Sequence, residues 1–453
     1  MAGAEGDRLP RDLGGGLRLR RATPNDADAL AAFNRRTHSW SPHAPMREAI
    51  DSWTRDLLGG AHPTTTPADF TLVEETGSGQ IVSSVGMIAQ TWSYGAVPIA
   101  IGRPELVGTD PAYRRRGLVR AQLALIHDWS AARGDLAQAI TGIPWYYRQF
   151  GYEMALALDS GRIGTTAQIP ARAAGQAEPY IVRQAQAADL PFLRRTYEAG
   201  MARYAVSARR DAAQWHYELA GRRAESIYAR RLCVIEDGAG MAVGLLIHWP
   251  FPLEGGLLIV EAYEVQAGTP WSAVTPSVLR YVGATGASYA AQAGAGTADT
   301  PYAGSQAFLL GTQHPAYEAA AQWLPQERRP YAWYLRVPDL PRFIRQVAPI
   351  LEGRLAASSL AGYSGERRLS FYRDGLRLVF DGGRLTTVEA WRPTDEAGGE
   401  GAFPEMTFLH LLFGHRSLSE VRHLFPDCWA DKETTELLDA IFPALPSSVW
   451  ALA

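Results

Sequence analysis

Hydrophobic and polar positions repeat along this chain in two stretches that lie 163 residues apart. The stretches at 17–34 and 180–197 both alternate like a short strand and then continue with helical spacing after a turn. The residues that recur are Arg20 and Arg183, Ala22 and Ala185, Asp26 and Asp189, and Leu30 and Leu193. Because an acidic turn residue is suited to begin a helix, both stretches predict a strand–turn–helix unit.

A second pair of similar stretches follows at an offset of 161 residues. Residues 71–92 and 233–249 each contain two strand-like runs around an acidic Gly-x-Gly turn, which predicts a hairpin. Since both pairs keep their order and nearly their spacing, we expect the same α/β module twice. Only the first copy continues with an arginine-rich turn, within 104–134, and 257–286 has none. We therefore expect one active copy and one scaffold copy.

A third region begins near residue 338. Residues 367–391 alternate apolar and polar side chains between glycine turns, which predicts an antiparallel meander, and helical patterns follow a loop at 392–405. We expect a separate α+β domain over 338–453. The fold class is thus α/β (α+β), with two modules of mixed sheet flanked by helices.

Composition limits the function classes. The 453 residues carry a formal net charge of −3, which disfavours a nucleic-acid partner. Two distant cysteines exclude a disulfide framework and a cysteine zinc site and fit a cytoplasmic protein. No apolar run is long enough to predict a membrane span, and we expect the glycine-rich residues 1–16 to form a disordered tail.

The arginine-rich turn, YRRRGLVR at 113–120, is the main candidate site. It lies between a short strand at 105–109 and a helix expected over 117–133, so its glycine and arginines surround a helix N-terminus. Free N–H groups and the helix dipole favour an anion there, and arginine adds charge-assisted hydrogen bonds. A solvated basic turn is the alternative.

The pattern Arg114-x-x-Gly117-x-Val119 after a strand resembles motif A of the GCN5-related N-acetyltransferase (GNAT) superfamily. The resemblance implies that acetyl-CoA is the cosubstrate and that its pyrophosphate binds at this turn. The implied cofactor-binding residues are Val107, Gly108 and Thr109 of the strand, and Arg114, Arg115, Arg116, Gly117, Leu118, Val119 and Arg120 of the turn. No metal is expected.

A second motif, Tyr147 to Tyr152, resembles the superfamily segment whose first tyrosine protonates the departing coenzyme A thiolate. A phenol suits this role because its ordinary pKa near 10 keeps it protonated at neutral pH. The resemblance therefore makes Tyr147 the candidate general acid, with Tyr146 as the fallback. An aromatic cluster that only packs the sheet is the alternative.

The whole chain resembles the enhanced intracellular survival (Eis) acetyltransferases. That resemblance implies a catalytic domain at 17–165, a degenerate GNAT-like domain at 178–337, and a sterol-carrier-like domain at 338–453. It also implies that the terminal carboxylate, here on Ala453, acts as general base. A terminus that lies on the surface is the alternative.

These observations predict direct acetyl transfer to a primary amine on a small molecule or a lysine side chain, with N–H groups near 107–109 as the oxyanion site. A homo-oligomer is compatible with this plan. The competing hypotheses are a lipid-binding protein that uses the third domain and a nucleic-acid binder. His38, Trp40 and His43 lie where the acceptor pocket is expected, whereas His410, His415 and Cys428 are expected to be structural.

Overall fold

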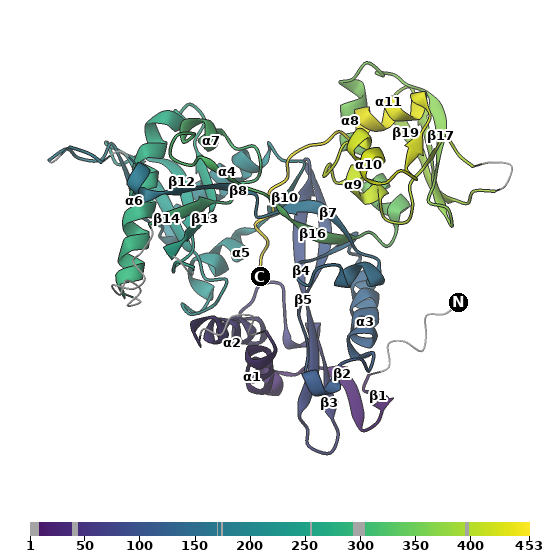
Figure 1. Cartoon of the computed structure of the whole chain (residues 1–453), viewed down its shortest axis with the longest axis horizontal. Coiled ribbons are helices and arrows are strands. Elements are labelled where there is room, and N and C mark those ends of the chain that lie inside the picture. Colours follow the sequence, from purple (N-terminus) through teal and green to yellow (C-terminus); the bar gives the residue numbers. More distant parts are fainter. Residues whose placement is uncertain are drawn as a thin grey trace.

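The computed structural model describes residues 9–38, 44–169, 171–173, 175–253, 256–292, 304–394 and 398–453. Three lobes surround a central junction, and the C-terminus ends in that junction (Figure 1). In the described part of the chain no helix has the length and apolar character that crossing a bilayer requires.

The first lobe is built on a mixed sheet. Its strand order is β1 (Arg11–Gly14), β2 (Leu17–Arg21), β3 (Phe70–Glu75), β4 (Ile81–Tyr94), β5 (Val97–Thr109), β6 (Ala137–Ile140), β16 (Tyr331–Arg336) and β7 (Glu153–Leu158). Helices α1 (Ala27–Thr37) and α2 (Ala44–Leu58) pack on one face, and α3 (Leu118–Arg133) packs on the other. These apolar faces enclose two cores, one on each side of the sheet.

The second lobe repeats this strand order. Its sheet runs β9 (Tyr180–Gln184), β11 (Arg231–Asp237), β12 (Ala242–His248), β13 (Leu258–Val265), β14 (Ser305–Phe308), β8 (Gly161–Thr165) and β15 (Gln326–Arg328). Its helices are α4 (Leu190–Met201), α5 (Ala212–His216), α6 (Trp271–Gln292) and α7 (Pro315–Ala319). A further strand of this lobe, β10 (Val206–Arg209), pairs with the far end of β4 and ties the two sheets together.

The recurring charged residues make the same contacts in both lobes. Arg20 pairs with Asp26 at 2.7 Å and with Glu74 at 2.7 Å. Arg183 pairs with Asp189 at 2.7 Å and with Glu236 at 2.7 Å. Each arginine thereby fixes the turn before the helix to the neighbouring strand.

The two lobes exchange strands, which corrects the predicted boundaries. β8 lies within the expected range 17–165 but pairs with β14 of the second sheet, and β16 lies within 178–337 but pairs with β6 and β7 of the first. The sequence cannot show such an exchange, because either strand satisfies the alternation of either sheet. The prediction of a disordered tail over 1–16 is also wrong for β1, which pairs with β2; residues 1–8 lie outside the described residues.

The third lobe contains the expected meander, formed by β17 (Gly365–Ser370), β18 (Gly375–Asp381) and β19 (Arg384–Trp391), with short strands β20 (Gly401–Ala402) and β21 (Trp429–Ala430) beside it. Helices α8 (Leu340–Ala356), α9 (Phe408–Leu412), α10 (Leu418–Leu424) and α11 (Lys432–Ile441) cover the sheet. After α11 the chain leaves this lobe and returns to the junction (Figure 1).

Candidate active site

A cleft opens in the first sheet where β5 and β6 separate. The two parallel strands pair only at Ile101–Ala137 and Gly102–Gln138, and β6 then pairs with β16 instead. The remaining half of β5, from Arg103 to Thr109, has no partner on that side among the described strands. Its backbone N–H and C=O groups are therefore available to a ligand.

A bulge turns the backbone of β5 inside this cleft. The register between β4 and β5 shifts between Ser84 and Gly86, and Leu106 has a φ of 52°. A left-handed conformation is costly for leucine and is held here by the buried position of its side chain. The bulge places Glu105 and Val107 on the cavity wall.

The arginine-rich turn stands at the end of this strand. Gly117 has a φ of 76° and is the N-cap of α3, and no side chain caps the free N–H groups of the first turn. Arg115 also has a positive φ, 63°. Glycine makes this turn possible at low cost, and the exposed amides and the helix dipole leave a site that suits an anion.

Tyr147 lies on the short 3₁₀ helix Tyr146–Phe150 that follows β6, and it is buried. Its ring meets that of Tyr334, from the exchanged strand β16, edge-on at 5.7 Å. Burial, the charge of Glu105 and neighbouring tyrosine hydroxyls raise the pKa of Tyr147 well above its usual value. The phenol is therefore protonated at neutral pH.

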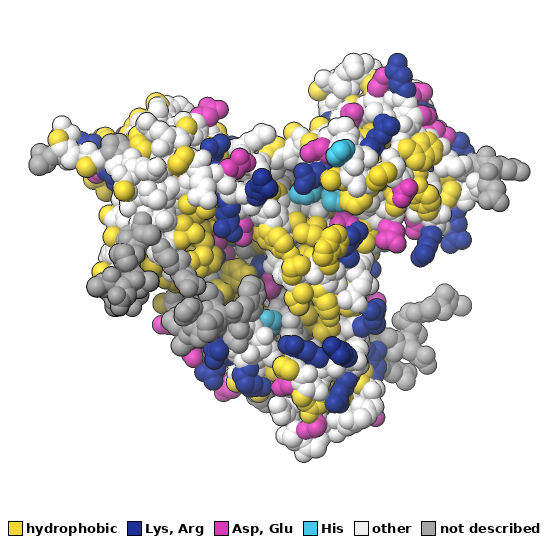
Figure 2. All heavy atoms as spheres, in the orientation of Figure 1, with side chains coloured by type: hydrophobic (Ala, Val, Ile, Leu, Met, Phe, Trp, Pro, Cys, Tyr) yellow, Lys and Arg dark blue, Asp and Glu magenta, His cyan; other side chains and the backbone are white. Residues whose placement is uncertain are grey.

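One cavity of about 1460 Å³ connects these features. Every predicted cofactor-binding residue except Arg116 lines it, as do Tyr147 and His38. The Arg116 side chain instead lies over the Tyr113 ring, 4.9 Å from its centroid. Trp40 and His43 lie outside the described residues. Figure 2 shows hydrophobic side chains gathered at the centre of one face of the molecule, with Lys and Arg side chains below them on the first lobe.

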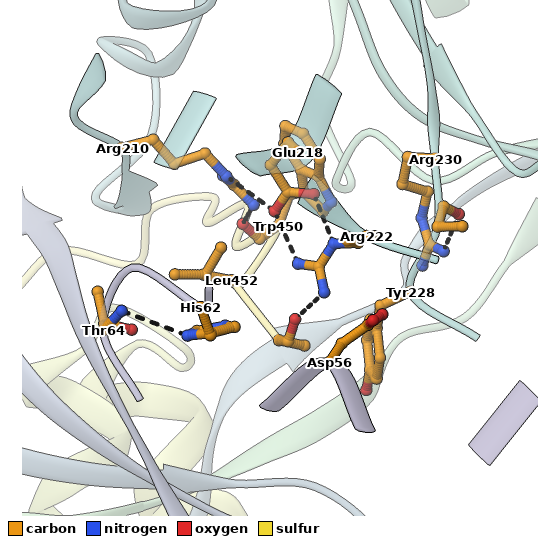
Figure 3. Close-up of polar contacts among 12 residues, drawn as sticks. Asp56, His62, Thr64, Arg210, Glu218, Arg222, Tyr228, Arg230, Trp450 and Leu452 are labelled. Atoms are coloured by element: carbon orange, nitrogen blue, oxygen red, sulfur yellow. Dashed lines mark hydrogen bonds and ion pairs between the residues drawn. The ribbon is translucent and has the colours of Figure 1, made fainter. Parts of the chain in front are cut away.

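The C-terminal tail forms part of the cavity wall, through residues 447–451, but Ala453 itself is fully buried and does not line the cavity. Arg222 contacts the Ala453 carbonyl oxygen, and Glu218 accepts hydrogen bonds of 3.1 Å from Arg222 (Figure 3). Arg210 donates to the Trp450 carbonyl at 2.7 Å. The alternative of a terminus on the surface is therefore wrong.

Sequence reasoning missed a second polar group at the junction. Arg103, buried on β5, donates to the Leu452 carbonyl at 2.9 Å and to the Tyr228 hydroxyl at 3.0 Å. It also forms an ion pair with Glu105. The sequence held one signal for this group: Arg103 and Glu105 are two charged residues on a strand that is otherwise apolar. Charged side chains on a buried strand need partners. The partners come from the second lobe and the tail, which the sequence does not place.

The residues expected to be structural lie in the third lobe, where His410 and Cys428 are buried and His415 is half-buried. His410 and His415 stack at 5.6 Å, and burial lowers the pKa of His410 to about 3 and that of His415 to about 4. Cys428 is buried among apolar side chains. Among the described residues, no three His, Cys, Asp or Glu side chains lie close enough to hold a metal ion.

Comparison with known proteins identifies the class. The family model of the acetyltransferase (GNAT) domain matches residues 18–155. These residues, which contain the open cleft, the arginine-rich turn and Tyr147, are thus an acetyltransferase (GNAT) domain, and the protein is an enzyme that carries this domain. No curated protein matches the sequence.

Solved structures resemble the whole chain. A probable N-acyltransferase from Enterococcus faecalis V583 has a TM-score of 0.65 at 12% identity, covering 95% of this chain and 98% of its own. A GCN5-related N-acetyltransferase from Kribbella flavida has a TM-score of 0.60 at 18% identity, with coverage of 96% and 98%. Eis1 from Mycobacterium abscessus has a TM-score of 0.56 at 13% identity, with coverage of 94% and 97%. At these identities the likeness is one of fold.

Proposed function

We propose that the protein transfers the acetyl group of acetyl-CoA directly to a primary amine, in the cavity at the junction of the lobes. The observation that carries this proposal is that the open end of β5, the arginine-rich turn and Tyr147 line one cavity. The second lobe acts as a degenerate copy of the module, and the third, sterol-carrier-like lobe supplies the tail that completes the wall.

The cofactor is held by backbone and arginine. The amides of Gly117 to Arg120 and the side chains of Arg114 and Arg115 bind the pyrophosphate, while the free edge of β5 pairs with the pantetheine arm. The N–H groups near Val107 to Thr109 polarise the thioester carbonyl, because these amides have no strand partner on that side. Acetyl-CoA fits this donor set, which combines amides and guanidinium groups with an extended strand edge.

Tyr147 donates the proton that the departing thiolate needs. Its hydroxyl has no hydrogen-bond partner among the described residues, and its raised pKa keeps the proton in place until the thiolate develops beside it. Tyr146 lines the same cavity and is less buried. We therefore keep Tyr147 as the acid.

Two carboxylates compete for the role of base. The carboxylate of Ala453, predicted from the resemblance, is fully buried and held near Arg222. Glu105 lines the cavity and its side chain is 13% exposed. Because a base must reach the amine directly or through one water molecule, access favours Glu105. The terminal carboxylate stays a prediction that the same experiment tests.

Release of free coenzyme A thiol from acetyl-CoA, measured with a panel of primary amines, tests the proposal. We expect amine-dependent release, and Glu105→Gln should lower kcat by about 10²-fold, the range of general-base catalysis. Removal of Ala453 should mainly lower the melting temperature. No release with any amine would contradict the function, and a larger kcat loss without Ala453 than in Glu105→Gln would return the base to the terminus.

A further inference from the structure

Arg103 is a charged residue buried at the central junction of the lobes. It lies on β5, in the part of the strand that still pairs with β4 opposite Ile88, and its side chain is 3% exposed. A charge that is taken out of water needs partners, because its lost hydration has to be replaced. The guanidinium group finds these partners in four different segments of the chain.

Two aromatic side chains, one from the second lobe and one from the exchanged strand, enclose this guanidinium group. Arg103 donates to the Tyr228 hydroxyl at 3.0 Å and lies 5.5 Å from the centroid of the same ring. It also lies 5.3 Å from the ring centroid of Trp333, on β16. Tyr228 in turn packs on Trp53 of α2, with 4.6 Å between the ring centroids. These contacts restrict the conformations open to the arginine.

The C-terminal tail supplies a further partner. Arg103 donates to the Leu452 carbonyl oxygen at 2.9 Å, and the side-chain amide of Gln90, on β4, donates to the same oxygen. The carbonyl oxygen of the Gln90 side chain accepts from the Trp92 indole at 2.7 Å. Because two donors hold the Leu452 carbonyl, the tail is fixed to the first sheet at this point. The tail therefore gives Arg103 an anchor of defined position.

The same guanidinium group holds Glu105. Residues two positions apart on a strand share a face, and Arg103 forms an ion pair with the Oε1 atom of Glu105. Glu105 stands where β5 leaves its register with β4, so its backbone is less well supported than that of Arg103. Among the described residues, the Oε2 atom of Glu105 accepts no hydrogen bond, and the side chain lines the cavity. One oxygen is thus held, while the other is available to a ligand.

Resting on the proposed N-acetyltransferase function, we propose that Arg103 is a positioning residue that orients Glu105 toward the acceptor amine, and that the second lobe and the tail act on the reaction through it. The positive charge has a second effect, because a neighbouring cation favours the ionised form of a carboxyl group. Two other groups interact with the charge of Glu105, namely Tyr147 and Tyr228. Burial raises the pKa of both, so they are neutral at neutral pH. Arg103 is therefore the charged neighbour that favours the carboxylate form.

A double-mutant cycle on kcat tests this assignment, with release of coenzyme A thiol from acetyl-CoA by the most active amine of the panel as the assay. Arg103→Met keeps an unbranched side chain and removes its charge. We expect kcat to fall by about 10²-fold, because a misplaced base loses the benefit of general-base catalysis. The affinity for coenzyme A, measured by calorimetry, should be unchanged. The variant with both Arg103→Met and Glu105→Gln should be no slower than Glu105→Gln alone, since Arg103 then has no base to position.

Arg103→Lys separates the charge from the geometry. Lysine keeps the positive charge but lacks the planar fork that holds several partners at once, so this variant should recover only part of the lost kcat. The acidic limb of its pH profile of kcat/KM should stay at the wild-type pH. In Arg103→Met the same limb should move to higher pH, because the carboxylate form is less favoured without the cation. If Arg103→Met does not fold, the cycle with Arg103→Lys in its place decides the assignment.

Arg230→Met is the matched control. Arg230 is also buried at the junction, binds Glu261 through hydrogen bonds of 2.6 and 2.8 Å, and lies 5.6 Å from the Tyr228 ring centroid. Its loss should lower the melting temperature and leave the acidic limb at the wild-type pH. A further loss of kcat from Arg103→Met in the Glu105→Gln background, or an unmoved acidic limb in Arg103→Met, would overturn the role of Arg103 and leave the proposed function standing. No thiol release by the wild type with any amine would overturn both.

Discussion

Tyr147 and Tyr317 follow corresponding strands of the two sheets but use their hydroxyls differently. Tyr147 comes after β6, faces the cavity and has no hydrogen-bond partner among the described residues. Tyr317 comes after β14 and is bonded to the backbone of its own lobe: it donates to the Phe308 carbonyl at 2.9 Å and accepts from the Leu310 amide at 3.0 Å. The Tyr147 hydroxyl is therefore available to donate a proton, whereas the Tyr317 hydroxyl is bonded to the backbone that follows β14.

The same contrast holds for the space between the strands. β13 and β14 also separate, since they pair only from Leu258 to Val260. In the second lobe, however, that space is filled by buried side chains, among them His314, Tyr263 and Tyr317. Glu264, on the free part of β13, is paired with Arg203 at 2.5 Å and His314 at 3.3 Å. The comparison teaches that strand separation alone does not make an open cleft, because buried side chains can fill the gap.

The largest effect is expected from Tyr147→Phe. Loss of the phenolic proton should lower kcat by about 10²- to 10⁴-fold, the range of general-acid catalysis, and leave coenzyme A affinity unchanged. Thiol-release kinetics and calorimetry measure the two quantities. Tyr146→Phe is the matched control and should keep its activity; the opposite result would move the acid to Tyr146.

A double variant, Arg114→Ala with Arg115→Ala, should weaken the site that distinguishes the first lobe. Charge-assisted hydrogen bonds are worth about 1.5–3 kcal/mol each, and exposure reduces that value here, so we expect coenzyme A to bind roughly 10- to 100-fold more weakly. The control is a second double variant, Arg194→Ala with Arg195→Ala on α4, because both side chains are exposed and lie outside the arginine-rich turn. This control should bind coenzyme A as tightly as the wild type. Equal affinities in the two double variants would remove the arginine-rich turn from the site.

Tyr317→Phe should act on stability and not on catalysis. It leaves a buried carbonyl and a buried amide without their partner, which costs about 1–3 kcal/mol in the free energy of unfolding. Denaturant titration measures this loss, while kcat should stay at the wild-type value. Tyr372→Phe, at an exposed position, serves as the control. A large loss of kcat in a folded Tyr317→Phe protein would give the second lobe a catalytic part.

The smallest effect is expected at His314. Burial lowers the pKa of His314 despite the neighbouring Glu264. As the pH falls below 6.5, the unfolded chain takes up a proton that the folded lobe resists, so stability decreases. Asparagine keeps the capability to cap α7 but does not titrate, so His314→Asn should show a shallower fall in melting temperature between pH 7 and 5. His216→Asn, on an exposed residue, should follow the wild type, and a steeper slope in His314→Asn would contradict this assignment.

Much of the fold was accessible from local patterns. Alternation and glycine turns located both hairpins and the meander of the third lobe, and helical spacing located α3, which begins at Leu118. The recurring Arg20 and Asp26 were recognised as a repeat, and their ion pair explains why both residues recur. These features depend on neighbours in sequence, so the sequence was sufficient.

The rest depends on contacts between distant segments. The exchange of β8 and β16 escaped prediction because pairing partners leave no local signal, yet β16 brings Tyr334 beside Tyr147. Arg116 belonged to the expected anion site, but its side chain packs on Tyr113 instead.

The number of coenzyme A molecules bound per chain tests the difference between the two lobes most directly. Calorimetric titration of the full-length protein should give one site per chain, which the Arg114→Ala, Arg115→Ala variant weakens and Tyr317→Phe leaves unchanged. Two equivalent sites, or one site that is insensitive to the arginine changes, would contradict the account, because the second lobe would then bind the cofactor.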